Sequence, residues 1–169
     1  TSRRIDRPIR PLFPKDLTND CSVVATLMSV DPDCSPEITA AIGVSAAIAI
    51  SDIPWAGPIS SVNVGLVDGE IVINPTLEQR AKTDLTLTVA STADLVAMIE
   101  AGGIEIDDET MFNAIMAGHE ENKKIVKFIQ GIVDEVGKPK FEYESSDPDP
   151  EIMKEIEDFC IEDVKKALD

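Results

Sequence analysis

The sequence predicts an α+β fold, with strand patterns and helix patterns gathered in separate stretches of a 169-residue chain. Two observations support this prediction. Apolar and polar residues alternate in several short runs between residues 59 and 100, whereas apolar residues three and four positions apart mark helices on either side. The expected order is therefore a strap, a strand, a helix, four strands, a long helix, a linker and a final helix.

The first well-marked helix is expected over residues 35–51. Ser35 can cap it, Pro36 suits the first helical position, and Glu37 favours the positive end of the helix dipole. Apolar residues occur nearly all round this helix. We therefore expect it to be buried on most sides.

The strand region begins with residues 21–30, a mostly apolar and β-branched run that predicts a buried strand. Residues 59–67 and 70–73 then alternate and meet at Asp68-Gly69, a strong signal for a tight hairpin turn. Residues 85–90 (L-T-L-T-V-A) predict a further strand, and residues 95–100 a returning one.

The longest helix is expected to begin at Asp107 or Asp108 and to end at Gly137, with Pro139 two residues further on. Residues 141–150 form an acidic linker that contains S-S-D-P-D-P. Residues 151–169 predict a second amphipathic helix.

Charge is distributed unevenly along the chain. The formal net charge is −17, so the chain as a whole repels nucleic acids and anionic membranes. Residues 1–15, however, contain five basic side chains and one acidic side chain, a local charge of +4. The negative net charge argues against an anionic partner, but a basic N-terminal segment is the stronger indication and favours one.

Three cysteines, Cys21, Cys34 and Cys160, occur without C-x-x-C spacing. An odd number in this pattern predicts a reduced, cytoplasmic protein with neither a disulfide framework nor a zinc site. No apolar run reaches the length of about 18 residues that a membrane span needs. Because the chain starts at Thr1 inside an arginine-rich segment, we expect it to be a fragment of a longer protein.

The main candidate site is the arginine cluster, defined as Arg3, Arg7 and Arg10. Arg3 and Arg7 would share one face of a helix, and prolines at 8, 11 and 14 predict an extended strap that holds Arg10. Guanidinium groups match phosphate oxygens, so the cluster suits a polyphosphate backbone. The alternative is that these arginines pair with some of the 32 acidic residues.

Other candidates are weaker. His119 is the lone histidine and lies within the predicted long helix, so a structural role is the favoured interpretation. Nothing forms a recognisable pair of catalytic carboxylates or a phosphate-binding glycine loop. We therefore predict no catalytic residue and no metal ligand in this chain.

Several segments resemble the bacterial polynucleotide phosphorylase family. The most specific is R-R-I-D-R-P-I-R-P-L-F-P at residues 3–14. Shorter matches follow in the family's order, at residues 41–47, 53–59, 74–76, 84–90, 98–100, 118–120 and 137–139. The resemblance covers about residues 1–140, and the tail is similar to the start of the family's all-helical linker domain.

The resemblance implies a ribonuclease PH-like fold for residues 1–140, as the C-terminal part of a first core domain, with a linker and the start of a helical domain over residues 141–169. It implies an enzyme that degrades RNA from the 3′ end by phosphorolysis and releases nucleoside diphosphates. It also implies Mg²⁺ or Mn²⁺ as cofactor and inorganic phosphate as co-substrate. The implied partners are single-stranded RNA, other copies of the chain in a homotrimeric ring, and other RNA-degradation proteins.

The same resemblance implies that catalysis and metal binding belong to a second core outside this chain. There an aspartate is followed two positions later by a lysine, whereas Asp84 is followed here by Thr86. This chain is therefore expected to be inactive alone, and Arg3, Arg7 and Arg10 to position the RNA backbone.

Two alternatives remain. One is a ribonuclease PH-like subunit of an exonuclease ring, which would not need a helical domain after Pro139. The other is an acidic scaffold domain whose arginines make internal ion pairs.

Overall fold

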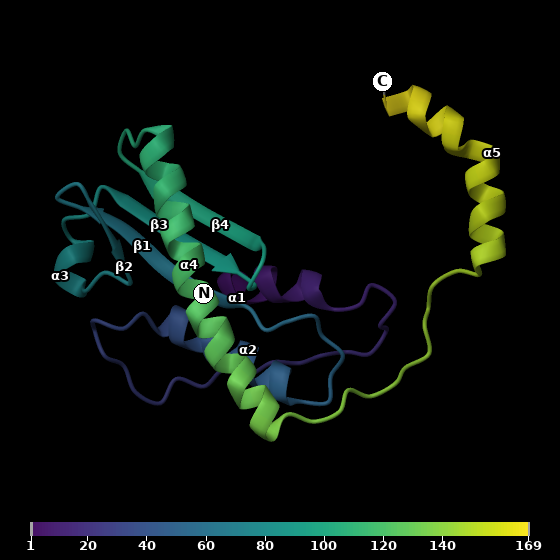
Figure 1. Cartoon of the computed structure of the whole chain (residues 1–169), viewed down its shortest axis with the longest axis horizontal. Coiled ribbons are helices and arrows are strands. Elements are labelled where there is room, and N and C mark those ends of the chain that lie inside the picture. Colours follow the sequence, from purple (N-terminus) through teal and green to yellow (C-terminus); the bar gives the residue numbers. More distant parts are fainter. Residues whose placement is uncertain (1, 169) are drawn as a thin grey trace. The chain divides into compact units, whose positions relative to one another are not determined.

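Four antiparallel strands form a sheet of order β2-β1-β3-β4 in the computed structural model, which describes residues 2–168 (Figure 1). The strands are β1 (Ser60–Val67), β2 (Glu70–Ile73), β3 (Leu85–Ser91) and β4 (Val96–Gly103). Asp68 and Gly69 both have positive φ, 52° and 82°, as the tight turn between β1 and β2 requires. The predicted α+β class and the predicted hairpin are thus confirmed.

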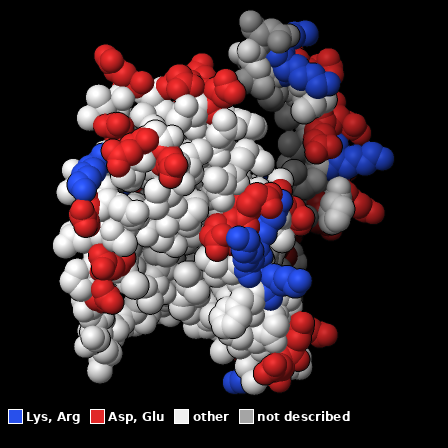
Figure 2. Space-filling model, turned by 60° about the vertical axis from the view of Figure 1, so that its left-hand side comes forward, with Lys and Arg blue, Asp and Glu red and all other residues white. Residues whose placement is uncertain are grey.

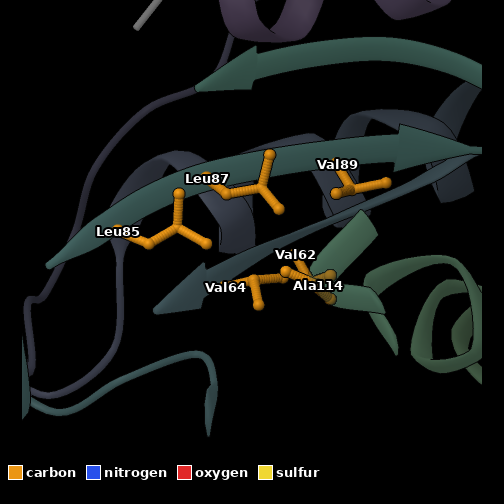
Figure 3. Close-up of a cluster of buried hydrophobic side chains, with 6 residues drawn as sticks. All are labelled: Val62, Val64, Leu85, Leu87, Val89 and Ala114. Carbon is orange, nitrogen blue, oxygen red and sulfur yellow. The ribbon is translucent and has the colours of Figure 1, made fainter. Parts of the chain in front are cut away.

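Helix α4 (Asp108–Val136) covers one face of this sheet. Its start is fixed by Asp107, whose carboxylate accepts a hydrogen bond of 2.9 Å from the backbone N–H of Thr110. Between the helix and the sheet lies an aliphatic core (Figure 3), in which Ala114 of α4 packs on strand side chains, namely Val62, Val64, Leu85, Leu87 and Val89. The helix approaches the strands closely at Gly118, because a Cβ atom there would lie 3.0 Å from Val89 Cγ2.

The opposite face of the sheet carries a second core. Val89 and Ala90 are neighbours on β3 and belong to different clusters, as the alternation of strand side chains requires. Ala90 packs with Ile9, Val44, Ile48 and Ile59, and so joins the sheet to the helices α1 (Ser2–Ile9) and α2 (Pro36–Ile50). The predicted helix over residues 35–51 is therefore confirmed.

The prolines do not produce the extended strap that the sequence predicted. Helix α1 continues through Pro8 to Ile9, and a 3₁₀ turn, η1, follows over Arg10–Leu12. Pro8 lies in the last turn of α1, where its missing N–H removes a single bond. Pro8 and Ile9 are both buried, and this packing outweighs the intrinsic preference of the sequence.

The buried strand predicted over residues 21–30 is also wrong. This segment has no strand structure, and Val24, Leu27 and Met28 are largely exposed. A strand needs a neighbouring strand to bond with its backbone. Among residues 2–168 none pairs with this run, although its composition is that of a core strand.

Lys140, near the end of the larger of the two units described below, binds the last turn of α2. Its Nζ donates to the carbonyl groups of Ala49 at 2.8 Å and Ser51 at 2.6 Å. The backbone N–H of Lys138 donates to the carbonyl of Ile50 at 3.0 Å. Burial lowers the pKa of Lys140 below its ordinary value. Carbonyl groups that the helix cannot satisfy itself are thus satisfied by a segment about 90 positions later.

The chain divides into two compact units, and the description above concerns residues 2–14 and 21–142. The second unit holds residues 15–20 and 143–168. Within it, the hydroxyl of Tyr143 donates to the Asp16 carboxylate at 2.8 Å, and helix α5 (Pro150–Leu168) has no buried residue. Across the described part of the chain, no helix is both long and apolar enough to cross a membrane.

Candidate functional site

The arginine cluster lies on α1 and η1, and all three of its side chains are exposed. Arg3 and Arg7 are four positions apart on α1, so they share one side of the helix as predicted. Arg10 follows in the 3₁₀ turn instead of an extended segment. The structure therefore presents the cluster on a short helical element.

Internal ion pairs account for some of these arginines. Arg10 Nη2 lies 2.8 Å from Asp6 Oδ1, and the neighbouring Arg4 Nε lies 2.9 Å from Glu100 Oε2. Within residues 2–168, neither Arg3 nor Arg7 forms a salt bridge. An exposed pair such as Arg10–Asp6 contributes about 0–1 kcal/mol, so an anionic ligand can displace it at low cost.

Acidic residues outnumber basic ones, 32 to 15, and on the face that Figure 2 presents acidic side chains lie in several separate groups and basic ones in only a few places. With a net charge of −17, the molecule repels a polyanion except near its basic elements. Two unpaired guanidinium groups on one helix side are therefore the strongest feature for phosphate contacts in α1.

A pocket of about 190 Å³ opens on the sheet face opposite α4. Polar side chains from several elements line it, among them Arg4 of α1, Glu37 of α2, Asn63 of β1, Arg80 and Thr86. Arg80 is the last residue of the short helix α3 (Leu77–Arg80), and Thr86 lies on β3. Residues that are 76 positions apart in the sequence thus meet in one pocket.

Hydrogen bonds fix several of the pocket side chains. Asn63 Oδ1 accepts from the Thr88 hydroxyl at 3.0 Å, which leaves the amide N–H groups of Asn63 as donors. Arg80 Nη2 donates to the carbonyl of Pro32, whereas Arg80 Nε is buried without a hydrogen-bond partner. A hydrogen bond from Ser35 and one from its own backbone N–H hold the pKa of Glu37 below the ordinary value.

The remaining candidates show no catalytic arrangement. His119 is buried on α4 with its Nδ1 2.9 Å from the Ser91 hydroxyl, the environment of a structural residue. Asp84, which directly precedes β3, and Thr86, which lies on β3, are both exposed. Among residues 2–168, no group of three or more His, Cys, Asp or Glu side chains could hold a metal ion.

Sequence reasoning missed the pocket entirely. Arg80 ends a short helix and looks like an ordinary solvated residue in the sequence. Neither its spacing from Arg4 nor a local motif marks the two residues as neighbours. The signal lies in the fold, which brings α1, α3 and two strands together.

Comparison with known proteins defines the class. Residues 57–121, which include the four strands and the first half of α4, match the model of the 3′ exoribonuclease family, domain 2. The crystal structure of Rrp46 from rice (Oryza sativa) has a similar fold, with a TM-score of 0.54 at 18% identity over 62% of this chain and 49% of that chain. The ribonuclease PH-like fold is thus confirmed.

Relatives that match nearly the whole chain identify its family more closely. The chain is 56% identical over 168 residues to the polyribonucleotide nucleotidyltransferase of Ruminiclostridium cellulolyticum and 54% identical over 168 residues to that of Clostridioides difficile. Each match covers 99% of this chain and 24% of the relative. The resemblance to bacterial polynucleotide phosphorylases is therefore confirmed, and the chain spans about a quarter of the length of the relatives it matches.

Proposed function

We propose that this chain is part of a 3′-to-5′ exoribonuclease that degrades RNA by phosphorolysis and releases nucleoside diphosphates. The observation that supports this most strongly is the identity of 56% over 99% of the chain to a polyribonucleotide nucleotidyltransferase. Residues 1–140 then form the C-terminal part of a first ribonuclease PH-like core, and residues 141–169 begin a helical linker domain.

In this proposal the chain guides RNA and takes no part in the chemistry. Arg3 and Arg7 are exposed on one helix side without acidic partners among the described residues, and Arg10 is held by a weak exposed pair. Guanidinium groups so placed donate to the phosphates of single-stranded RNA and orient its backbone. The Mg²⁺ or Mn²⁺ and the reacting phosphate would be bound by residues outside this chain, in a homotrimeric ring.

The tail argues against a simple ribonuclease PH-like ring subunit. The alignment with the nucleotidyltransferases extends through α5, whereas the similarity to rice Rrp46 covers 62% of the chain. An acidic scaffold is favoured by the Arg10–Asp6 and Arg4–Glu100 pairs alone. Neither pair involves Arg3 or Arg7, so we retain the RNA-guiding role.

The test uses the full-length protein with a double charge reversal, Arg3→Glu with Arg7→Glu. A matched control reverses Lys82 and Lys127, which are exposed and lie outside α1. The affinity for single-stranded RNA is measured at several salt concentrations. Loss of two phosphate contacts should lower the slope of log affinity against log salt by about 1.4 in magnitude.

Turnover is followed in the same samples as phosphate-dependent release of nucleoside diphosphates. Products that form without phosphate, or that are monophosphates, would contradict phosphorolysis. An unchanged salt slope in the Arg3/Arg7 variant, beside normal turnover, would remove the RNA-guiding role but leave the enzyme class in place.

A further inference from the structure

The pocket on the sheet face opposite α4 contains a cation whose donors are not all used. Arg80 has no acidic partner among residues 2–168, and its buried Nε lacks any hydrogen-bond acceptor. A ligand cannot reach this buried Nε, but the terminal nitrogens of Arg80 are only partly used. Nη2 donates to the carbonyl of Pro32, and Nη1 makes no hydrogen bond among the described residues, so Nη1 is left as a donor at the pocket.

The other donors of the pocket converge on the same space. Arg4 uses its Nε for Glu100, which leaves the two terminal nitrogens of its guanidinium group. Asn63 contributes amide N–H groups, because its Oδ1 accepts from Thr88. Thr86 adds an exposed hydroxyl from β3. These donors come from three different elements, and together they can surround a tetrahedral group with several oxygens.

Charge limits the size of the ligand. The lining holds two guanidinium groups and one carboxylate, that of Glu37, which is kept ionised by its hydrogen bond from Ser35. Glu100 pairs with Arg4 beside the lining, so the site has little excess positive charge, which suits one phosphate group better than a chain of several. Arginine at such a site favours phosphate because its fork of donors matches two phosphate oxygens.

We propose that this pocket binds a single phosphate group, held by Arg80 and Arg4 with Asn63 and Thr86. The site stands on the pocket geometry alone. The choice of source rests on the proposed function, in which inorganic phosphate is consumed and a nucleoside diphosphate is released. Both carry the same terminal group, so either could occupy the pocket.

The experiment is hydrogen–deuterium exchange on the full-length protein, because it locates binding to individual segments. Phosphate should slow exchange in peptides that cover residues 31–38 and 76–84, relative to chloride of equal ionic strength. Separate titrations with phosphate and with ADP distinguish the two sources, since the tighter ligand gives protection at the lower concentration.

Three variants connect any protection to the named residues. Arg80→Gln should weaken binding by about 10-fold to 100-fold, as expected for loss of a hydrogen bond to a charged group. Thr86→Val keeps a β-branched strand residue and should weaken it by about 2-fold to 10-fold. Glu37→Gln removes a repelling charge and should tighten binding by about threefold. Lys82→Gln is the matched control, since Lys82 pairs with Glu78 outside the pocket.

Each outcome of the exchange experiment either supports the phosphate site or overturns it. Protection that is lost in Arg80→Gln and kept in Lys82→Gln supports the site. Absence of protection in the unmodified protein would overturn it. Protection in Arg80→Gln and Thr86→Val that equals the protection in the unmodified protein would also overturn it. Phosphorolysis measured in the same samples is a separate readout, so that normal turnover without protection rejects the pocket and leaves the proposed function intact.

Discussion

Gly118 marks the closest approach of α4 to the sheet, and replacing it with alanine tests how tightly this layer is packed. A Cβ atom at this position would lie 3.0 Å from Val89 Cγ2 and 3.1 Å from Val64 Cγ2. Both valines are completely or almost completely buried, and β-branched side chains have little freedom to rotate away. The new methyl group must therefore push the helix from the sheet.

Two effects of opposite sign set the magnitude. Alanine is favoured over glycine inside a helix by about 1 kcal/mol, whereas overpacking a well-filled core costs about 1–3 kcal/mol. Gly131, on the same helix, provides a control, because a Cβ atom there meets nothing within 4 Å. The helix-propensity gain is common to both variants. Gly118→Ala should therefore be less stable than Gly131→Ala by about 1–3 kcal/mol.

Urea unfolding followed by Trp55 fluorescence measures the difference. Trp55 is the single tryptophan, and its Nε1 donates to the carbonyl of Ile9 in the same unit as α4. With a denaturant slope near 2 kcal/mol per molar urea, the two midpoints should differ by about 0.5–1.5 M. If Gly118→Ala unfolds at the same or a higher urea concentration than Gly131→Ala, the close approach described here is wrong.

Three further substitutions test other contacts. Lys140→Met should destabilise the larger unit by about 1–3 kcal/mol in thermal unfolding, because the carbonyl groups at the end of α2 lose a charged donor, whereas Lys138→Met should have little effect. The hydrogen bond from Thr110 lowers the pKa of Asp107 below 3.8, so the stability it gives is present above that value and is lost as pH falls further. Asp107→Asn should flatten this acid dependence in urea midpoints measured below pH 4, and an unchanged slope would contradict it. Asp6→Asn should tighten RNA binding by freeing the guanidinium group of Arg10; weaker binding would contradict the RNA-guiding role.

Local signals in the sequence predicted most of the elements correctly. The hairpin at Asp68-Gly69 depends on backbone conformations that these residues favour, and α4 begins at a cap that Asp107 supplies by itself. The proline strap failed, because burial of Pro8 and Ile9 stabilises a helix that local preference disfavours. The conformation of this segment is thus set by its contacts with distant segments and not by its own residues.

The same distinction applies to the candidate site. Arg3 and Arg7 could be placed on one side of a helix because their spacing is local. The pocket could not be predicted, since Arg4 and Arg80 meet only after the sheet and α3 have formed. The strand predicted over residues 21–30 was wrong for a related reason, because a strand pattern does not identify the strand that must pair with it.

The contact between Lys140 and α2 also bears on protein synthesis. Ser51 leaves the ribosome 89 residues ahead of the lysine that binds its carbonyl group. At elongation rates of about 5–20 residues per second, Lys140 is synthesised roughly 4–18 s after the end of α2. An α2 that forms in this interval lacks the Lys140 donor until the sheet and α4 have been made. A pause in translation before the codon for Lys140 would prolong the interval in which this unit is open to chaperones and proteases.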